Sequence, residues 1–129
     1  MNYDTLFVSP NGRTARGPFI GAVITLLAAL AFYYFEVPGR NSQWVQLVFL
    51  YPGVVLHARR LHDMGITAWL LVIPAALVIA MAWLYLFVPE SEIKGIVALI
   101  AQIVCAAFIV WGLAGKGQAE ANRFGAAAT

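Results

Sequence analysis

Residues 66–88, ITAWLLVIPAALVIAMAWLYLFV, lie in the longest charge-free stretch of this 129-residue chain. A helix rises about 1.5 Å per residue, and the hydrocarbon layer of a bilayer is about 30 Å thick, so about 20 such residues cross it. Because lipid offers no partner to backbone N–H and C=O groups, a helix is the expected conformation. This stretch therefore predicts a transmembrane helix.

Three further stretches without charge cover residues 17–35, 41–58 and 95–115. We therefore expect spans near 18–36, 43–59, 66–88 and 95–114, within a single membrane domain, 1–129, that has tails at 1–17 and 115–129. The apolar part of the second span is short and contains Pro52 and Gly53, so a re-entrant or interfacial segment is its alternative. The expected fold class is all-α, an integral membrane four-helix bundle.

Composition excludes several classes of protein. Hydrophobic residues make up 62% of the chain and charged residues 11%, whereas soluble domains average about 45–50% apolar, glycine included, and about 25% charged. So small a domain has too little interior to hide that much apolar surface from water, which excludes a soluble enzyme. The net charge of +2 comes from eight basic residues without a dense run, which excludes a nucleic-acid module.

Lys and Arg are distributed unevenly among the tails and loops. Six lie in the two tails and in the loop between spans two and three, namely Arg13, Arg16, Arg59, Arg60, Lys116 and Arg123. Only Arg40 and Lys94 lie on the other side of the predicted bundle. By the positive-inside rule, this asymmetry predicts that both termini are cytoplasmic.

The first span carries small residues at every fourth position, Gly17, Gly21, Thr25 and Ala29. In lipid, helices associate by close packing of small residues, because apolar side chains gain nothing by leaving lipid. We expect a helix–helix contact along this face, within one chain or between two. The alternative is that small residues recur at this spacing by chance, because the sequence is rich in Ala and Gly.

The second span carries a polar stripe. Gln46, Gly53, His57 and Arg60 fall on one helical face in projection, and polar groups at membrane depth need partners. One interpretation is that Gln46 and His57 form hydrogen bonds to neighbouring helices. The other is that the stripe lines a path for transport.

The segment 57–65, HARRLHDMG, holds the densest chemistry. On a continuing helix, Asp63 is within reach of both Arg59 and Arg60, and Gly65 suits the end of that helix. A structural charge pair is one reading. The other is an anionic headgroup site to which Arg13, Arg16 and Arg123 contribute.

No metal, cofactor or nucleophile is expected. His57 and His62 point apart on a helix, no Cys or further His completes a metal site, and the single cysteine, Cys105, lies within an apolar span where a thiol stays protonated.

Three separated pieces resemble the bacterial inner-membrane family catalogued as domain of unknown function 805. They are GRTARGPF at 12–19, RRLHDMG at 59–65 together with Trp69, and NRFG at 122–125. Ile20 departs from a frequent tryptophan of that family, and residues 66–68 replace a more polar turn.

The resemblance implies a four-helix integral protein of the bacterial cytoplasmic membrane and no particular activity. It singles out Arg13, Arg16, Arg59, Arg60, His62, Asp63 and Asn122. We expect these residues to form one polar cluster that joins the N-terminal tail, the middle loop and the C-terminal tail.

Two functions are weighed from this. The first is a non-enzymatic membrane module or accessory subunit, whose polar cluster binds an anionic phospholipid or a partner in a homo-oligomer or larger membrane complex. The alternative is a small oligomeric transporter or channel with a polar path along the second span. An enzyme is disfavoured because the chain shows no pairing of a base with a nucleophile.

Overall fold

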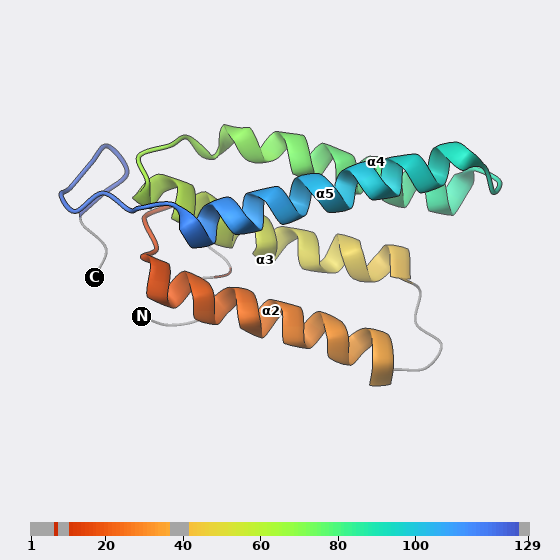
Figure 1. Ribbon diagram of the computed structural model, residues 1–129, viewed down its shortest axis with the longest axis horizontal. Coiled ribbons are helices and arrows are strands. Elements are labelled where there is room, and N and C mark those ends of the chain that lie inside the picture. Colours follow the sequence, from red (N-terminus) through yellow and green to blue (C-terminus); the bar gives the residue numbers. More distant parts are fainter. Residues whose placement is uncertain (1–6, 8–10, 37–41, 127–129) are drawn as a thin grey trace.

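The computed structural model describes residue 7, residues 11–36 and residues 42–126, and of residues 42–46 it describes the backbone only. The four long helices are α2 (Arg16–Glu36), α3 (Ser42–Asp63), α4 (Val72–Phe87) and α5 (Glu92–Ala114), and the 3₁₀ turn η1 (Ala68–Leu71) precedes α4. They lie along one long axis and successive helices run in opposite directions (Figure 1). The expected all-helical class is confirmed for the described residues.

The helix limits differ most from the expected spans in two places. The second helix continues past residue 59 to Asp63, and the third apolar segment begins as a 3₁₀ turn before α4. Thr67 is extended and its hydroxyl accepts the Trp69 backbone N–H at 3.4 Å, which starts that turn. Pro74 lies in the first turn of α4, where a missing backbone N–H costs nothing.

Gly65 ends α3, as the sequence predicts. Its φ is +79°, in the left-handed region that favours glycine. The Ile66 N–H donates to the Leu61 carbonyl at 2.8 Å, and the Gly65 N–H donates to the His62 carbonyl at 3.0 Å. This pair of bonds is a Schellman motif, which satisfies carbonyls at the end of the helix.

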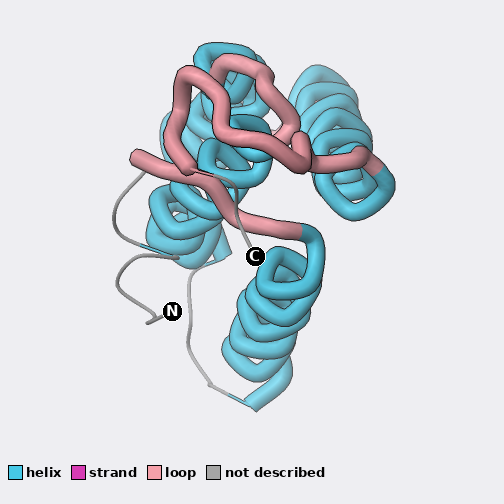
Figure 2. Tube along the Cα trace, turned by 90° about the vertical axis from the view of Figure 1, so that its left-hand side faces the viewer, coloured by secondary structure: helices cyan, strands magenta, loops and turns pink. Residues whose placement is uncertain are grey.

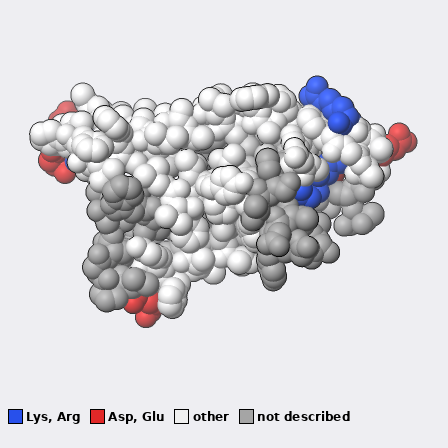
Figure 3. All heavy atoms as spheres, turned by 180° about the vertical axis from the view of Figure 1, so that it is seen from behind, with Lys and Arg blue, Asp and Glu red and all other residues white. Residues whose placement is uncertain are grey.

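Three helical segments are long and apolar enough to cross a membrane: Arg16–Glu36, Ala68–Phe87 and Glu92–Ala114. The remaining expected span falls in α3, which is not among them. On the face drawn in Figure 3, charged side chains lie near the two ends and the middle is uncharged. Large apolar side chains such as Ile24, Phe32, Trp83 and Ile103 are exposed there or on other outer faces, as in proteins surrounded by lipid.

α3 and α5 each contact all three of the other long helices, and α3 also contacts η1. Two groups of buried apolar side chains surround the second half of α3. The first contains Phe19, Ala22, Val23 and Leu56, and the second contains Ala58, Leu61 and Leu71. The tightest packing therefore lies toward the end of the bundle where α3 finishes.

Among the described residues, the small-residue face of α2 does not pack closely against another helix, so the expected contact is not found within the chain. Gly17, Gly21, Thr25 and Ala29 are all exposed, and nothing lies within 4 Å of a Cβ built at either glycine. The helix instead turns Phe19, Ala22 and Val23 inward, because these positions also repeat at helical spacing and bring more surface into contact. A contact between two chains at this face stays a prediction.

Candidate functional site

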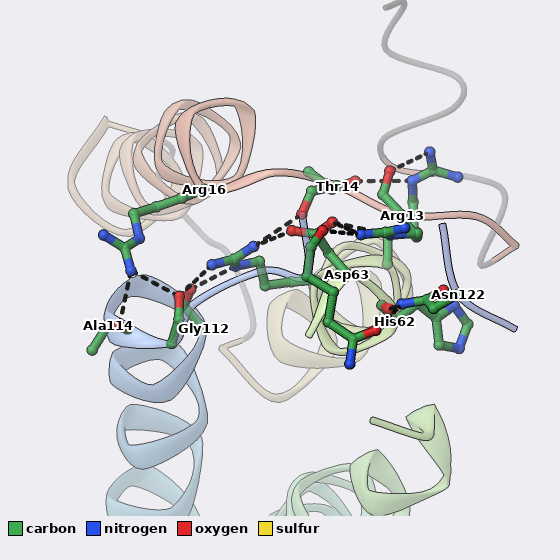
Figure 4. A network of polar contacts seen from close by, with 12 residues as sticks. Arg13, Thr14, Arg16, His62, Asp63, Gly112, Ala114 and Asn122 are labelled. Atoms are coloured by element: carbon green, nitrogen blue, oxygen red, sulfur yellow. Dashed lines mark hydrogen bonds and ion pairs between the residues drawn. The ribbon is translucent and has the colours of Figure 1, made fainter. Parts of the chain in front are cut away.

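Three segments that are distant in the sequence meet at one end of the bundle. They are residues 11–15 before α2, the end of α3 with its following turn, and residues 115–126 after α5 (Figure 1). Figure 2, seen at this end, shows the loop segments crossing over the helix ends. The side chains that join the segments are shown in Figure 4.

Asp63 is the centre of the site. Its Oδ1 accepts Arg13 Nε at 3.1 Å and lies 3.0 Å from Arg13 Nη2, while its Oδ2 accepts Arg60 Nη1 at 2.7 Å. The Asp63 side chain is 5% exposed and both guanidinium side chains are 1% exposed. The predicted Arg60–Asp63 pair is confirmed, and the second pair comes from Arg13, 50 residues away (Figure 4).

Arg13 also holds the C-terminal segment. Its Nη1 donates to the carbonyls of Glu120 at 2.8 Å and Gly125 at 3.2 Å, and its Nη2 donates to the Gln118 carbonyl at 2.5 Å. The planar guanidinium presents five N–H groups in a fixed fork, so it can serve a carboxylate and several carbonyls together. One side chain thus fixes residues 118–125 against the end of α3.

Arg60 connects α3 to the end of α5. Nε donates to the Gly112 carbonyl at 2.8 Å, Nη2 to the Gly115 carbonyl at 2.5 Å, and Nη1 to the Thr14 carbonyl at 3.3 Å. Gly112 and Gly115 stand where α5 ends and its carbonyls lack intrahelical partners. Burial lowers the pKa of Arg60 from its ordinary value, and the Asp63 carboxylate opposes that shift.

Arg59 points to the N-terminal segment. Its Nε donates to the Thr14 hydroxyl at 3.0 Å, its Nη2 to the Arg13 carbonyl at 3.2 Å and its Nη1 to the Asn11 carbonyl. In return the Thr14 N–H donates to the Arg59 carbonyl at 3.1 Å. Thr14 is fully buried and was not among the predicted site residues, although it lies inside the piece GRTARGPF.

His62 and Asn122 complete the connection to the C-terminal segment. His62 Nδ1 donates to the Gly12 carbonyl at 3.0 Å, and Asn122 Nδ2 donates to the His62 carbonyl at 3.0 Å. The His62 ring stacks on Phe124, with 4.0 Å between ring centroids. We call Arg13, Thr14, Arg59, Arg60, His62, Asp63 and Asn122 the polar network.

Two predicted site residues lie at its rim. Arg16 is exposed, and its Nη2 donates to the carbonyls of Ala114 at 3.0 Å and Gly115 at 2.9 Å, so it caps α5 (Figure 4). Arg123 is also exposed, with its guanidinium over the ring of Phe124 at 4.6 Å. The structure therefore brings together six of the eight predicted residues and leaves these two outside.

Glycines in α5 and after it allow the close approach of these segments. A Cβ at Gly117 would lie 1.9 Å from Asp63 Oδ2, and a Cβ at Gly112 would lie 2.6 Å from the Phe19 ring. Either distance is far below van der Waals contact. The sequence shows these glycines plainly, but only the folded chain shows what each one faces.

The network leaves a shallow cleft of about 400 Å³ at its rim. Arg16 and Lys116 line it as exposed cations, and the buried pair of Arg60 and Asp63 forms part of its wall. Within the described part of the chain, no group of three or more His, Cys, Asp or Glu is placed to hold a metal. The cleft therefore offers cationic contacts at the end of the bundle.

The residues of the predicted polar stripe lie in different places in the structure. Gly53 and His57 line a cavity whose other walls are mostly apolar, Arg60 belongs to the network, and the side chain of Gln46 lies outside the described residues. His57 Nδ1 donates to the Gly53 carbonyl at 2.8 Å within the same helix. Its ring meets Phe19 edge to face, with centroids 5.2 Å apart.

Comparison with known proteins places the chain in a family. Residues 7–126 match the family described as protein of unknown function (DUF805). The match covers nearly the whole chain, so the chain belongs to this family, in agreement with the resemblance drawn from its three motifs. No curated protein and no solved structure matches it.

Proposed function

We propose that this family member is a non-enzymatic, multi-pass module of the bacterial cytoplasmic membrane that acts as an accessory subunit of a larger membrane complex. The observation that carries the proposal is the state of Asp63, a buried carboxylate shared by two buried guanidiniums. Those guanidiniums also donate hydrogen bonds to backbone carbonyls of the same chain. The polar residues of segment 57–65 therefore hold segments of the chain together, which is a structural role.

The same contacts argue against catalysis. A general base needs a free lone pair within reach of a substrate, but the Asp63 carboxylate is buried and its oxygens accept from Arg13 and Arg60. An arginine does not lose its proton in proteins. What remains is a rigid junction of three chain segments, which suits a structural or docking module.

The cytoplasmic placement of the network is part of the proposal. All six basic residues counted on that side lie in the network, in its cleft or on its rim. Lys and Arg concentrate on the cytoplasmic side of membrane proteins. The exposed apolar faces of α2, α4 and α5 support insertion in lipid.

Thiol labelling tests this orientation. In a Cys105→Ala background, Ala121→Cys places an exposed thiol beside the network and Ser91→Cys places one at the opposite end, before α5. In intact spheroplasts, a membrane-impermeant maleimide should react with Ser91→Cys, and it should react with Ala121→Cys only after permeabilisation. The reverse pattern, or reaction of both in intact spheroplasts, would contradict the proposed topology.

Native mass spectrometry tests the accessory role. The protein is extracted in mild detergent from cells that express it at its natural level. We expect a stoichiometric assembly that contains a second membrane polypeptide, either another copy or a different subunit. A bare monomer in every mild detergent would reject the accessory-subunit role while leaving the topology result unaffected.

Contact with an anionic headgroup is a second role, favoured by the rim cleft. Arg59 and Arg60, which the sequence suggested for this purpose, are buried and directed to their own chain, so the exposed Arg16 and Lys116 are the better candidates. A Lys or Arg near an anionic membrane surface contributes about 1 kcal/mol, or about fivefold in affinity.

Lipid retention distinguishes this cleft from general surface attraction. In nanodiscs that contain phosphatidylglycerol, Arg16→Gln and Lys116→Gln should each reduce the retained anionic lipid by about fivefold. Arg123→Gln removes one exposed cation outside the cleft and should have little effect. An equal loss in all three variants would mean that the cleft has no specific role.

A further inference from the structure

Residues 116–126, which we call the C-terminal strap, cross the end of the bundle outside any helix (Figure 2). They are exposed except for Asn122 and Phe124, which are half-buried, and a single bridge between Asn122 and Gly125 is their regular backbone pairing within the described part of the chain. Segments with few buried apolar contacts open locally at low free-energy cost. The strap is therefore the part of this end that separates most easily from the helices.

Arg13 is the main anchor of the strap. Its guanidinium donates to three strap carbonyls, those of Gln118, Glu120 and Gly125, at 2.5–3.2 Å. The Arg13 side chain is 1% exposed, and a buried donor that loses its acceptor is costly. The open strap is therefore stabilised by any group that returns several oxygen acceptors to Arg13.

The other two segments stay joined without the strap. Asp63 accepts from Arg60 within α3 and from Arg13 in the N-terminal segment, and Arg59 donates to the Thr14 hydroxyl. Two guanidiniums around one carboxylate leave a net positive charge beneath the strap. Opening the strap would expose this positive charge and leave the contacts between the two segments in place.

The strap also forms one wall of the rim cleft. Its residues 116–119 line one part of the cleft, and Ala15, Arg16, Arg60 and Asp63 line the other. Gln118 both lines the cleft and accepts from Arg13 through its carbonyl. Movement of the strap would therefore extend the cleft to the Arg13 guanidinium.

We propose that the C-terminal strap is an autoinhibitory segment, whose carbonyl oxygens occupy on Arg13 the place that a phosphate group takes when the strap opens. The proposal rests on the headgroup role of the rim cleft and adds its regulation. Phosphate oxygens carry charge and suit the planar guanidinium fork, so they bind Arg13 more strongly than neutral carbonyls do. The exposed cations Arg16 and Lys116 stand beside the same opening.

Hydrogen exchange of the full chain in nanodiscs tests the competition. The exchange of residues 116–126 is measured by mass spectrometry in discs of phosphatidylcholine alone and in discs that also contain phosphatidylglycerol. We expect the strap to exchange about threefold faster with phosphatidylglycerol, as for a ligand at about twice its Kd for the open strap. The Val88 N–H, bonded to the Leu84 carbonyl at the other end of the bundle, should exchange equally in both.

The source of the phosphate is distinguished by adding inorganic phosphate to the discs of phosphatidylcholine. Faster strap exchange under this condition supports the proposal and identifies free phosphate as a sufficient ligand. Acceleration with phosphatidylglycerol alone supports it and identifies the lipid headgroup. Equal strap exchange under all three conditions would overturn the proposal.

Phe124→Ala tests whether opening and binding are linked. It removes the ring that stacks on His62, and the loss of an aromatic pair should raise the open population about fivefold. Because the closed strap predominates, the apparent affinity for phosphatidylglycerol should rise by the same factor. Native mass spectrometry over a series of lipid contents measures this affinity. Phe124→Tyr keeps the ring and should behave as the wild type, whereas faster exchange of Phe124→Ala without tighter lipid retention would show that the strap does not compete.

The cleft variants separate this proposal from the headgroup role. If Arg16→Gln and Lys116→Gln lose lipid while phosphatidylglycerol leaves strap exchange unchanged, the headgroup role stands and the strap proposal fails. If these variants and Phe124→Ala all retain lipid as the wild type does, both fail. The wild-type exchange comparison needs no variant, so it decides the matter even where Phe124→Ala does not fold.

Discussion

The end of the bundle that contains the polar network and the middle of the bundle are held together by different interactions. At the network end, buried charges and backbone carbonyls satisfy one another across three segments, and the apolar side chains around them are buried. In the middle, four helices line a cavity of about 500 Å³. The small-residue face of α2 is exposed there, and no other described segment lies within 4 Å of a Cβ built at Gly17 or Gly21.

The difference follows from the solvent expected around each half. Lipid is as apolar as leucine, so helices within it gain little from burying apolar side chains and need close packing or polar contacts to associate. Charged side chains are costly at membrane depth, so guanidinium and carboxylate groups are favoured at the end of the bundle rather than in its middle. The bundle is therefore held by polar contacts at one end and is less closely packed in its middle.

The largest expected effect is at Asp63. Asp63→Asn keeps the shape but leaves the Arg13 and Arg60 guanidiniums buried without a counter-charge, which should cost about 3–5 kcal/mol of unfolding free energy. Glu36→Gln, which changes an exposed carboxylate at the other end of α2, should stay within about 0.5 kcal/mol of wild type. Reversible unfolding in mixed micelles measures both variants, and equal stabilities would mean that the network does not fasten the bundle.

A smaller effect is expected where α5 approaches α2. The added methyl group of Gly112→Ala would lie 2.6 Å from the Phe19 ring. This clash should reduce the free energy of unfolding by about 1–3 kcal/mol. Gly95→Ala lies in the same helix with open space around it and should gain up to about 1 kcal/mol from helix propensity. The same unfolding assay compares them, and opposite signs are expected. A loss in both variants would show that the close approach at Gly112 is not what matters.

The smallest effect is expected in the middle. Ala75 in α4 lines the cavity and is half-buried, so Ala75→Leu should fill empty space and stabilise the protein by about 0.5–2 kcal/mol. Ala76→Leu adds the same atoms on an exposed position of that helix and should change little. If Ala75→Leu proved destabilising, the middle would be as tightly packed as the network end.

Much of the fold was predictable from the sequence. The charge-free stretches placed all four helices, and Gly65 marked the end of α3 because a left-handed turn residue was needed there. The Arg60–Asp63 pair followed from helical spacing alone. These features depend on residues close together in the chain, where local geometry leaves few alternatives.

Other parts of the site could not be predicted in this way. The second guanidinium on Asp63 belongs to Arg13. The Gly112 carbonyl accepts from Arg60, and the carbonyls of Gln118 and Glu120 accept from Arg13. Carbonyls are present at every residue, so no sequence signal distinguishes those that will be used. Phe124 and its stacking on His62 were likewise missed as part of the site.

The small-residue face of α2 shows the opposite error. The spacing of Gly17, Gly21, Thr25 and Ala29 places four small residues on one face of the helix, but spacing does not say what lies against that face. Among the described residues, no other helix packs closely there. Phe19 and Val23 on another face of the helix fill the interior instead. Periodicity therefore gave a candidate contact surface and not its partner.

By itself, the sequence determined that this chain forms apolar helices of membrane-spanning length with its charges at their ends, because hydropathy and charge act residue by residue. Only the tertiary structure decided that Asp63 is enclosed by Arg13 and Arg60, that Arg16 and Arg123 stay at the rim, and that a cavity opens beside His57. Those outcomes depend on which helix faces meet and how closely. Such a choice arises from packing between segments up to about a hundred residues apart, and local sequence does not encode it.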